Sequence, residues 1–304
     1  MKLKTKNLLT LSELSKKEFS QIIEYSIKLK KELKKGRNPQ LLKNKSLTMI
    51  FQKPSTRTRV SFEIGMFQLG GKAINLSSND MQLSRGESIE DTAKTLSGYT
   101  DCIMARVYDH EMLEKLAVHS TVPVINGLSD SFHPCQILAD FMTIKENKGK
   151  LKGLKIAWIG DGNNVCNSMI NGCALSDTKM SVATPKGFEP AKDVIAKARK
   201  SIEIEITTNP KEAIKNADVV VTDTFSSIHN RDPKRTKKFL PKYQVNSELM
   251  KLAKKNAIFM HCLPAKRGSE VTSSVIDGPQ SVVWDEAENR LHSQKALLVF
   301  LINA

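Results

Sequence analysis

The feature that most constrains this chain is a repeated alternation of short apolar segments with longer amphipathic ones. The short segments indicate buried strands, and apolar residues at helical spacing indicate helices between them. Strands that alternate with helices pair in parallel and are covered on both faces, so the sequence predicts an α/β fold of doubly wound parallel sheets. The expected strands are 46–51, 73–76, 102–107, 122–126, 154–159, 180–183, 202–206, 219–222 and 257–261.

The alternation stops once, at Asn147-Lys148-Gly149-Lys150, and then starts again. Because 304 residues suffice for two domains of roughly 150 residues, we expect a boundary near Gly149. The domains are then 1–148 and 149–286, with residues 287–304 as a helix that packs back on the first domain. Thr10-Leu11-Ser12-Glu13 has the spacing of a capping box and predicts a first helix from there to about Lys35. The other expected helices are 58–69, 89–99, 111–120, 134–146, 164–175 and 211–216.

The net charge of +15 raises the question of nucleic-acid binding. The excess is mostly lysine spread along the chain, and only 6% of the residues are aromatic, so no stacking platform accompanies the charge. We therefore expect a solvated basic surface whose positive field gathers an anionic substrate, and no nucleic-acid partner.

The cysteine pattern indicates a reducing compartment. The five cysteines, Cys102, Cys135, Cys166, Cys173 and Cys262, are scattered and contain no CxxC pair. Residues 1–14 lack the apolar region of a secretory signal, and no apolar run approaches the ~18 residues of a membrane span. We therefore expect a cytoplasmic protein without a membrane partner.

The strongest local motif is Ser55-Thr56-Arg57-Thr58-Arg59, which follows an expected strand and opens an expected helix. Free N–H groups and the positive dipole end at a helix start bind anions, and an arginine fork takes a phosphate through two bonds. Arg57 and Arg59 are two residues apart, so on a helix they cannot both face one ligand. We assign the phosphate to Arg57 and a supporting or structural role to Arg59. An ordinary helix cap with solvated arginines is the alternative that this motif alone leaves open.

A second motif, His133-Pro134-Cys135-Gln136, accompanies the first, which is itself flanked by Phe51-Gln52-Lys53-Pro54 and by Val60-Ser61-Phe62-Glu63. With these motifs nearly the whole chain resembles the aspartate/ornithine carbamoyltransferase family. Such enzymes place negative charge on the carbonyl oxygen of carbamoyl phosphate when an amine attacks it, so the site needs donors aimed there. The resemblance implies that Ser55, Thr56, Arg57 and Thr58 hold the phosphate and that Arg106, His133 and Gln136 surround the carbamoyl group. It also implies that Pro134 and Cys135 contact carbamoyl phosphate.

The turn from Gly160 to Asn164 lies between an expected strand and an expected helix. It fails as a dinucleotide fingerprint, because GxGxxG requires glycine at the position of Val165. It resembles instead the ornithine branch of the family, in which the position of Asn164 contacts the amino acid. His261-Cys262-Leu263-Pro264 also resembles that branch, which implies that Cys262 and Leu263 border the reacting groups and that Cys262 acts as a base or a dipole. A buried apolar cysteine is the alternative.

Asp223 follows an expected strand, where a carboxylate can pair with an ammonium group. In the family this position and Ser227 bind ornithine, within a loop that reads Asp-x-x-x-Ser-Met-Gly. Here Ile228 and His229 replace the Met and the Gly, so Ile228 enters the expected ornithine site in the place of a flexible side chain. The departure leaves putrescine or an N-acylated ornithine open as the acceptor.

The resemblance implies direct attack of an amine on carbamoyl phosphate in a cleft between the two domains, as in the urea-cycle type of reaction. It implies no metal, no organic cofactor, and a homotrimer in which Gln82 reaches a neighbouring subunit's site, while Arg290 contacts carbamoyl phosphate. Synthesis and breakdown of arginine both stay open as the setting. A rival from another class, suggested by the charge and the glycine-rich turn, is a nucleotide-binding regulatory or nucleic-acid-binding protein.

Overall fold

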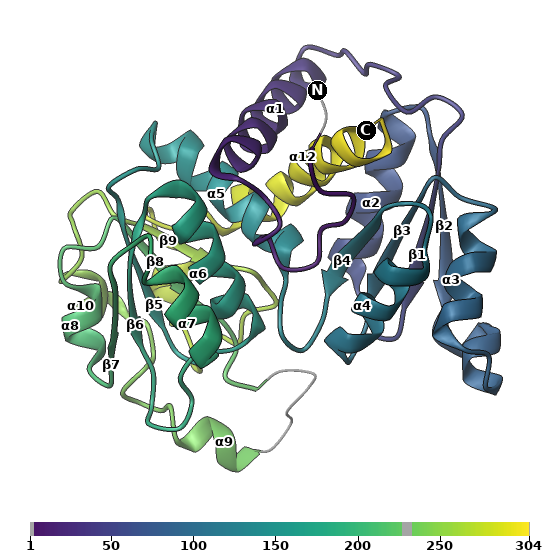
Figure 1. Ribbon diagram of the computed structural model, residues 1–304. Helices are drawn as coiled ribbons and strands as arrows, with labels where there is room; N and C mark the ends of the chain where they lie inside the picture. Colours follow the sequence, from purple (N-terminus) through teal and green to yellow (C-terminus); the bar gives the residue numbers. More distant parts are fainter. Residues whose placement is uncertain (1–2, 227–232, 304) are drawn as a thin grey trace. The chain divides into compact units, whose positions relative to one another are not determined.

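The computed structural model describes residues 3–226 and 233–303. The chain divides into two compact units, Met1–Met142 with Glu288–Ala304 and Thr143–Ala287. Each unit has its own sheet, in which neighbouring strands are parallel and helices connect them (Figure 1). The predicted α/β class with doubly wound parallel sheets is therefore confirmed.

The sheet of the first unit has the strand order β2-β1-β3-β4. In its register Phe51 lies beside Ser77 on one side and beside Arg106 on the other, so the carboxyl ends of these strands share one edge of the sheet. The connection changes direction between β1 and β3, and ligands of open α/β sheets bind at such a switch point. The strands are β1 Ser46–Phe51, β2 Lys72–Ser77, β3 Cys102–Arg106 and β4 Val124–Leu128.

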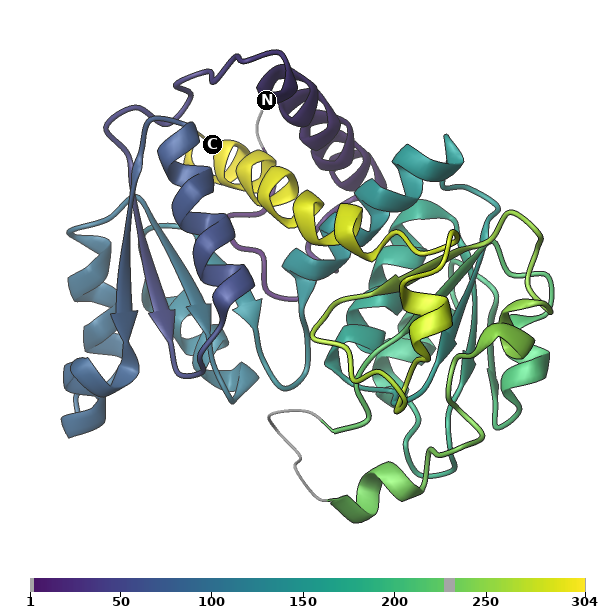
Figure 2. The ribbon, with the colours of Figure 1, turned by 180° about the vertical axis from the view of Figure 1, so that it is seen from behind.

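Helices cover both faces of this sheet. On one face, Leu113 and Leu116 of helix α4 join Ile50 and Ile103 of the strands in a buried apolar cluster. On the other face α2 and α12 lie side by side (Figure 2). The helices are α1 Lys16–Lys34, α2 Thr56–Gln68, α3 Ile89–Ser97, α4 His110–His119, α5 Pro134–Lys148, α12 Val283–Ile302 and the short 3-10 helices η1 Ser78–Asp80 and η2 Gln82–Arg85.

The sheet of the second unit has the order β7-β6-β5-β8-β9, with its switch point between β5 and β8. Trp158 of β5 lies beside Val221 of β8, which in turn lies beside Met260 of β9. Residues that directly follow these three strands therefore meet at one edge of the sheet. The strands are β5 Lys155–Ile159, β6 Lys179–Ala183, β7 Ile204–Thr207, β8 Val219–Thr222 and β9 Ile258–His261.

In the second unit, side chains of the strands and of the helices form one buried apolar cluster. Ala157 and Ile159 of β5 belong to this cluster together with Ala213 of α8, and the rings of Phe225 and Phe239 stack within it at 4.6 Å. In the described ranges 3–226 and 233–303, no helix has the length and apolar content to cross a membrane. The helices are α6 Asn164–Ser176, α7 Lys192–Ala198, α8 Pro210–Ile214, α9 Pro233–Lys237, α10 Ser247–Met250 and α11 Ser273–Ile276.

The predicted start of the first helix is wrong. Helix α1 begins at Lys16, because Ser15 and Glu18 form the capping box that satisfies its first N–H groups. Glu13 does accept from the backbone N–H of Thr10 at 2.9 Å, so the predicted spacing forms a local turn ahead of the helix instead. Leu11 within this turn has φ +83°, which a helix does not allow.

Candidate active site

The first cluster of predicted residues lies where β1 leads into α2, at the carboxyl edge of the first sheet. Ser55 is the N-cap of α2, and its hydroxyl accepts a hydrogen bond from the Thr58 N–H at 3.3 Å. Thr56, Arg57 and Thr58 form the first helical turn. This end of the helix presents backbone N–H groups and the positive end of the dipole, the two features that bind a phosphate.

The two arginines of the motif lie in different environments. Arg59 has a side chain that is 53% exposed, and its Nε pairs with Glu63 Oε1 at 3.2 Å. Arg57 is partly buried, and its positive charge contributes to the lowered pKa of the buried His133. The helical spacing thus directs Arg57 toward the cluster and Arg59 toward solvent.

Arg290 reaches this cluster from α12. Its guanidinium is buried and donates from Nη2 to Thr58 Oγ1 at 3.1 Å, and from Nη1 to Gln136 Oε1 at 2.7 Å. Its Nε donates to Gln294 Oε1 at 3.0 Å. One guanidinium therefore joins α2, α5 and α12, and it brings together three residues that the sequence assigned to carbamoyl phosphate.

The carboxamide of Gln136 has a fixed orientation. Its Oε1 accepts from Arg290, and its Nε2 donates to the buried Asp140 Oδ1 at 2.8 Å. A guanidinium only donates and a carboxylate only accepts, so turning the amide over would break both bonds. Asp140 was not predicted from the sequence, although its place four residues after Gln136 on an expected helix is a usable signal.

His133 lies just before α5 and is buried. Burial lowers the pKa of its imidazole well below the usual value, and the positive charges of Arg290, Arg106 and Arg57 lower it further. The ring is therefore neutral near pH 7, with one nitrogen as a donor and the other as an acceptor. Such a ring can donate a hydrogen bond to a developing oxyanion without adding a fourth positive charge.

Arg106 ends β3, and its carbonyl accepts a hydrogen bond from the Gln52 N–H at 2.9 Å. Lys53 is buried beside it: burial lowers the pKa of Lys53 to about 8, and the charge of Arg106 acts in the same direction. The Nζ of Lys53 lies 4.1 Å from the centre of the Tyr108 ring. Sequence reasoning assigned no role to Lys53, although its position directly before Pro54 and Ser55 was a signal.

Pro134, Cys135 and Gln82 are three further residues that the sequence assigned to carbamoyl phosphate. Pro134 is the first residue of α5. The buried Cys135 donates from Sγ to the Asn126 carbonyl at 3.3 Å, and burial raises the pKa of its thiol to about 12. Gln82 is exposed on η2. Their contacts with carbamoyl phosphate stay predictions.

The second cluster lies at the carboxyl edge of the second sheet, where β5, β8 and β9 end. Asp223, buried after β8, accepts at Oδ2 from Asn163 Nδ2 at 2.7 Å, and at Oδ1 from Cys262 Sγ at 3.1 Å. The Thr224 N–H also donates to Oδ1, at 2.7 Å. The structure thus brings two predicted residues into contact, because the Cys262 thiol donates to the Asp223 carboxylate.

Asn163, which the sequence did not single out, contributes most to the position of Asp223. Its Oδ1 caps α6 by accepting from the N–H groups of Val165 at 3.0 Å and Cys166 at 3.1 Å. The predicted Asn164 is the first residue of that helix. Ser227, Ile228 and His229, which were predicted to influence the bound amine, lie outside the described residues.

His261, the last residue of β9, orders the backbone that follows Cys262. Its Nδ1 accepts from the Leu263 N–H at 2.9 Å, and its Nε2 lies 3.3 Å from Glu270 Oε1. Ligand atoms of Asp223, His261 and Cys262 lie within 4.8 Å of one another, the spacing of a metal site. Because both ring nitrogens of His261 already have protein partners, this histidine orders the Leu263 backbone and is poorly disposed to bind a metal.

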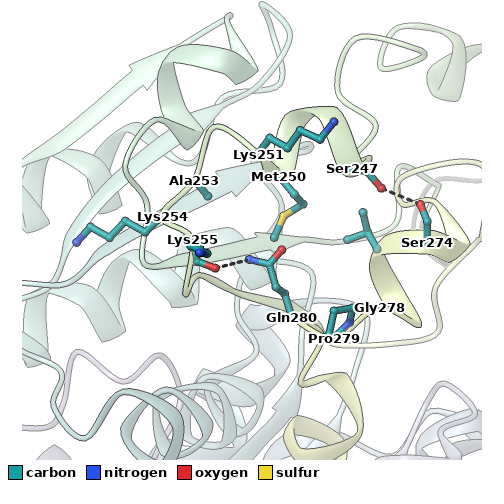
Figure 3. Close-up of a pocket in the computed structure, with 11 residues that line it drawn as sticks. Ser247, Met250, Lys251, Ala253, Lys254, Lys255, Ser274, Gly278, Pro279 and Gln280 are labelled. Atoms are coloured by element: carbon teal, nitrogen blue, oxygen red, sulfur yellow. Dashed lines mark hydrogen bonds between the residues drawn. The ribbon is translucent and has the colours of Figure 1, made fainter.

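A pocket of about 540 Å³ lies at the opposite edge of the second sheet, before β9 begins (Figure 3). The ammonium group of Lys254 points away from it and pairs with Asp218 at 2.8 Å. The Gln280 side chain donates to the Ala257 carbonyl at 2.9 Å. Among the described residues that line this pocket, none is a predicted site residue.

Comparisons with known proteins show the family to which the chain belongs. Residues 6–146 match the carbamoyl-P binding domain of the aspartate/ornithine carbamoyltransferase models, and residues 152–301 match the Asp/Orn binding domain. The chain is 64% identical over 301 residues to the ornithine carbamoyltransferase of Cenarchaeum symbiosum, with 99% of each chain covered. Its fold is similar to that of the Pyrococcus furiosus ornithine carbamoyltransferase, with a TM-score of 0.94 and 51% identity over 98% of this chain and 97% of that one. It is also similar to the anabolic ornithine carbamoyltransferase of Campylobacter jejuni, with a TM-score of 0.92 and 41% identity over 99% of this chain and 100% of that one. The chain therefore belongs to the aspartate/ornithine carbamoyltransferase family.

Proposed function

We propose that the chain transfers the carbamoyl group of carbamoyl phosphate to the side-chain amine of L-ornithine, giving L-citrulline and phosphate. The observation that carries this proposal is the buried guanidinium of Arg290, which holds Thr58 and Gln136 at the anion-binding end of α2. Relatives at 52% to 64% identity over nearly the whole chain are named ornithine carbamoyltransferase. The acceptor is assigned on that likeness together with the carboxylate of Asp223.

The principal ligands of the proposed carbamoyl-phosphate site belong to residues 1–148, with Arg290 added from the terminal segment 287–304 and Cys262 and Leu263 from residues 149–286. The phosphate takes its donors from the first turn of α2, which offers N–H groups and the Arg57 fork. The carbamoyl group lies against the carboxamide of Gln136. The proposed set comprises Ser55, Thr56, Arg57, Thr58, Gln82, Arg106, His133, Pro134, Cys135, Gln136, Cys262, Leu263 and Arg290.

The ornithine site is proposed within residues 149–286. Asp223 supplies a negative charge for an ammonium group of the amino acid, and Asn163 and Thr224 hold its carboxylate in place. Cys262 lies against the same carboxylate. The proposed set comprises Asn164, Asp223, Ser227 and Ile228.

The reaction requires donors for two developing charges. The neutral amine attacks the carbonyl carbon, a C–N bond forms, the C–O bond to phosphate breaks, and the amine releases a proton. Arg106 and the neutral His133 stabilise the charge on the carbonyl oxygen, while Arg57 and the hydroxyls stabilise the departing phosphate. Preorganised donors in a water-poor site typically supply the largest share of such a rate enhancement.

A steady-state assay of phosphate release from carbamoyl phosphate tests the proposal. L-Ornithine, putrescine and an N-acylornithine are supplied in parallel, and we expect the highest kcat/KM with L-ornithine. Preference for another amine would overturn the acceptor. Failure to release phosphate with any of the three amines would overturn carbamoyl transfer itself.

The double variant Ile228→Met, His229→Gly should keep most of the ornithine turnover. No retardation of DNA or RNA in a gel at physiological salt is expected.

We further propose that the chain works as a homotrimer. Helix α2 exposes Val60, Ile64 and Phe67 at spacings of four and three residues, so these side chains form one apolar stripe, and Phe67 is 75% exposed. An exposed apolar stripe marks a contact surface. The expected reach of Gln82 into a neighbouring site agrees with such an assembly.

The Phe67→Glu variant should sediment as a smaller species than the unmodified protein, because a charge buried in an interface without a partner is unfavourable. Val118→Glu is the matched control, since Val118 of α4 is also apolar and 76% exposed. The control should sediment like the unmodified protein. Equal behaviour of both variants would contradict the placement of the interface on α2.

The reaction is proposed to take place in the cytoplasm as a step of arginine biosynthesis. Cys102, Cys135, Cys166 and Cys173 are buried thiols, which agrees with a reducing compartment. The similar Campylobacter jejuni enzyme is described as anabolic, which supports the biosynthetic direction.

A further inference from the structure

Gln294 is fully buried on α12, one helical turn after Arg290. Its Oε1 accepts from Arg290 Nε at 3.0 Å, and its Nε2 donates to Ser61 Oγ at 2.7 Å. The Ser61 hydroxyl in turn donates to the Arg57 carbonyl at 2.6 Å. A single amide thus connects the side chain of one arginine of the proposed site to the backbone of the other.

The donor and the acceptor of each hydrogen bond in this series, from Arg290 through Gln294 and Ser61, are determined. Arg290 has donors only, so the oxygen of the Gln294 amide must face it and the nitrogen must face Ser61. Ser61 accepts from that nitrogen and donates its own proton, with the Arg57 carbonyl as the nearer acceptor at 2.6 Å and the Thr58 carbonyl as the farther one at 3.2 Å. Since no member can reverse its polarity without losing a bond in a buried place, the chain holds one arrangement.

The guanidinium of Arg290 is fixed in its plane by bonds from each of its three nitrogens. Gln136 and Thr58, which accept from Nη1 and Nη2, are themselves proposed to contact carbamoyl phosphate. Gln294, the third acceptor, is not. It is therefore the partner that can hold the plane when the substrate draws Gln136 and Thr58 into its own hydrogen bonds.

We propose that Gln294 is a positioning residue for carbamoyl phosphate, acting on the substrate through Arg290 and, by way of Ser61, through the first turn of α2. This inference rests on the proposed function. A misplacement of about 1 Å in a binding group can reduce catalysis by about a hundredfold. An amide that orients two arginines can therefore affect carbamoyl phosphate without contacting it.

The Gln294→Leu variant keeps the size of the side chain and removes both hydrogen bonds. The affinity of the free enzyme for carbamoyl phosphate, measured by calorimetry, should fall at least tenfold. The KM for carbamoyl phosphate should rise by a similar factor. The KM for ornithine should stay within about twofold of the unmodified value, because Gln294 does not belong to the proposed ornithine site. A general loss of folding would instead lower the apparent kcat and leave both KM values nearly unchanged.

Lys295→Met is the matched control. Lys295, the next residue of α12, is also buried and also contacts α2, where its Nζ donates to Gln68 Oε1 at 2.8 Å. Gln68 is the last residue of α2, at the opposite end from Arg57. The control removes a comparable α2–α12 contact and should leave the affinity for carbamoyl phosphate unchanged.

Ser61→Ala provides a second variant should Gln294→Leu fail to fold. It leaves the bond from Arg290 to Gln294 in place and breaks the connection to Arg57, so a smaller loss of affinity is expected. In the Gln294→Leu, Ser61→Ala double variant the losses should not add, because both changes interrupt one chain. Additive losses, unchanged affinity in Gln294→Leu, or equal losses in Gln294→Leu and Lys295→Met would overturn the proposal.

The unmodified protein distinguishes failure of this inference from failure of the proposed function. If it binds carbamoyl phosphate but does not carbamoylate ornithine, the proposed acceptor is wrong and the affinities of the variants still decide the role of Gln294. If it carbamoylates ornithine and Gln294→Leu keeps full affinity, only the inference is wrong.

Discussion

Replacing Arg57 with alanine is expected to abolish the binding of carbamoyl phosphate to the free enzyme. Arg57 is the arginine in the first turn of α2, where N–H groups and the helix dipole already favour an anion. A charge-assisted hydrogen bond contributes about 1.5–3 kcal/mol, and an arginine fork can form two of them with a phosphate. Loss of both corresponds to a decrease in affinity of roughly two to four orders of magnitude.

Calorimetric titration with carbamoyl phosphate measures this effect, and Arg59→Ala is its matched control. Both variants lose one positive charge from the same helix, but Arg59 pairs with Glu63 and is half exposed. The control should therefore bind carbamoyl phosphate nearly as well as the unmodified protein. Equal weakening in both would mean that the overall positive field, and not a specific fork, captures the substrate. Unchanged affinity in Arg57→Ala would remove that residue from the site.

The parallel sheets could be predicted because their strands are buried on both faces. The segments 103–105 and 219–221, for example, are apolar without interruption, as is typical of strands in a covered parallel sheet. Short helices carry much weaker signals. The helices α10 and α11 have four residues each, little more than one turn, so no apolar periodicity can develop and the sequence did not predict them.

The sequence predicts a start of the first helix that is several residues too early, because two stretches have the spacing of a capping box. These stretches follow one another, Thr10 with Glu13 and Ser15 with Glu18. The first forms hydrogen bonds from Thr10 to the Glu13 carboxylate, and the second forms the complete reciprocal box. Only the second is followed by uninterrupted helical backbone. Local capping chemistry therefore marks candidate starts, and the packing of Phe19 against Phe141, with ring centroids 5.3 Å apart, is a tertiary contact that the local pattern does not contain.

The candidate site was predictable where its residues follow strands or stand in contiguous motifs. Ser55 and Asp223 each follow a strand at a switch point, so their location follows from the topology. Gln294 and Asn163 were missed for a physical reason: their roles depend on partners more than fifty residues away that only folding brings near. The sequence around a polar residue, whether it lies in a helix like Gln294 or before one like Asn163, does not indicate such a distant partner.

Replacing Asp223 with asparagine is expected to impair the ornithine half of the reaction and to spare the carbamoyl-phosphate half. The carboxylate accepts from Asn163 through one oxygen and from Thr224 and Cys262 through the other. A carboxamide has one oxygen, so its NH₂ group must face a donor on one side. Asn163 cannot turn over to accept from it, because its own oxygen caps α6.

The substitution therefore removes the negative charge proposed for the ornithine ammonium and also creates a buried contact between two donors. We expect the KM for ornithine or the turnover to worsen at least tenfold, since a lost charged partner is worth about 1.4 kcal/mol or more. Calorimetry with carbamoyl phosphate should give nearly unchanged affinity, because its proposed principal ligands belong to the other unit.

Asn163→Ser separates the two causes. Serine keeps an oxygen that can cap α6 but no longer donates to Asp223, so the local network is weakened while the charge remains. If the charge recognises ornithine, this variant should lose far less activity than Asp223→Asn. Similar losses in the two variants would show that Asp223 acts by holding the turn and not by pairing with the substrate. A loss of affinity for carbamoyl phosphate as large as that for ornithine would indicate a folding defect, and no loss for either substrate would place the amine site away from Asp223.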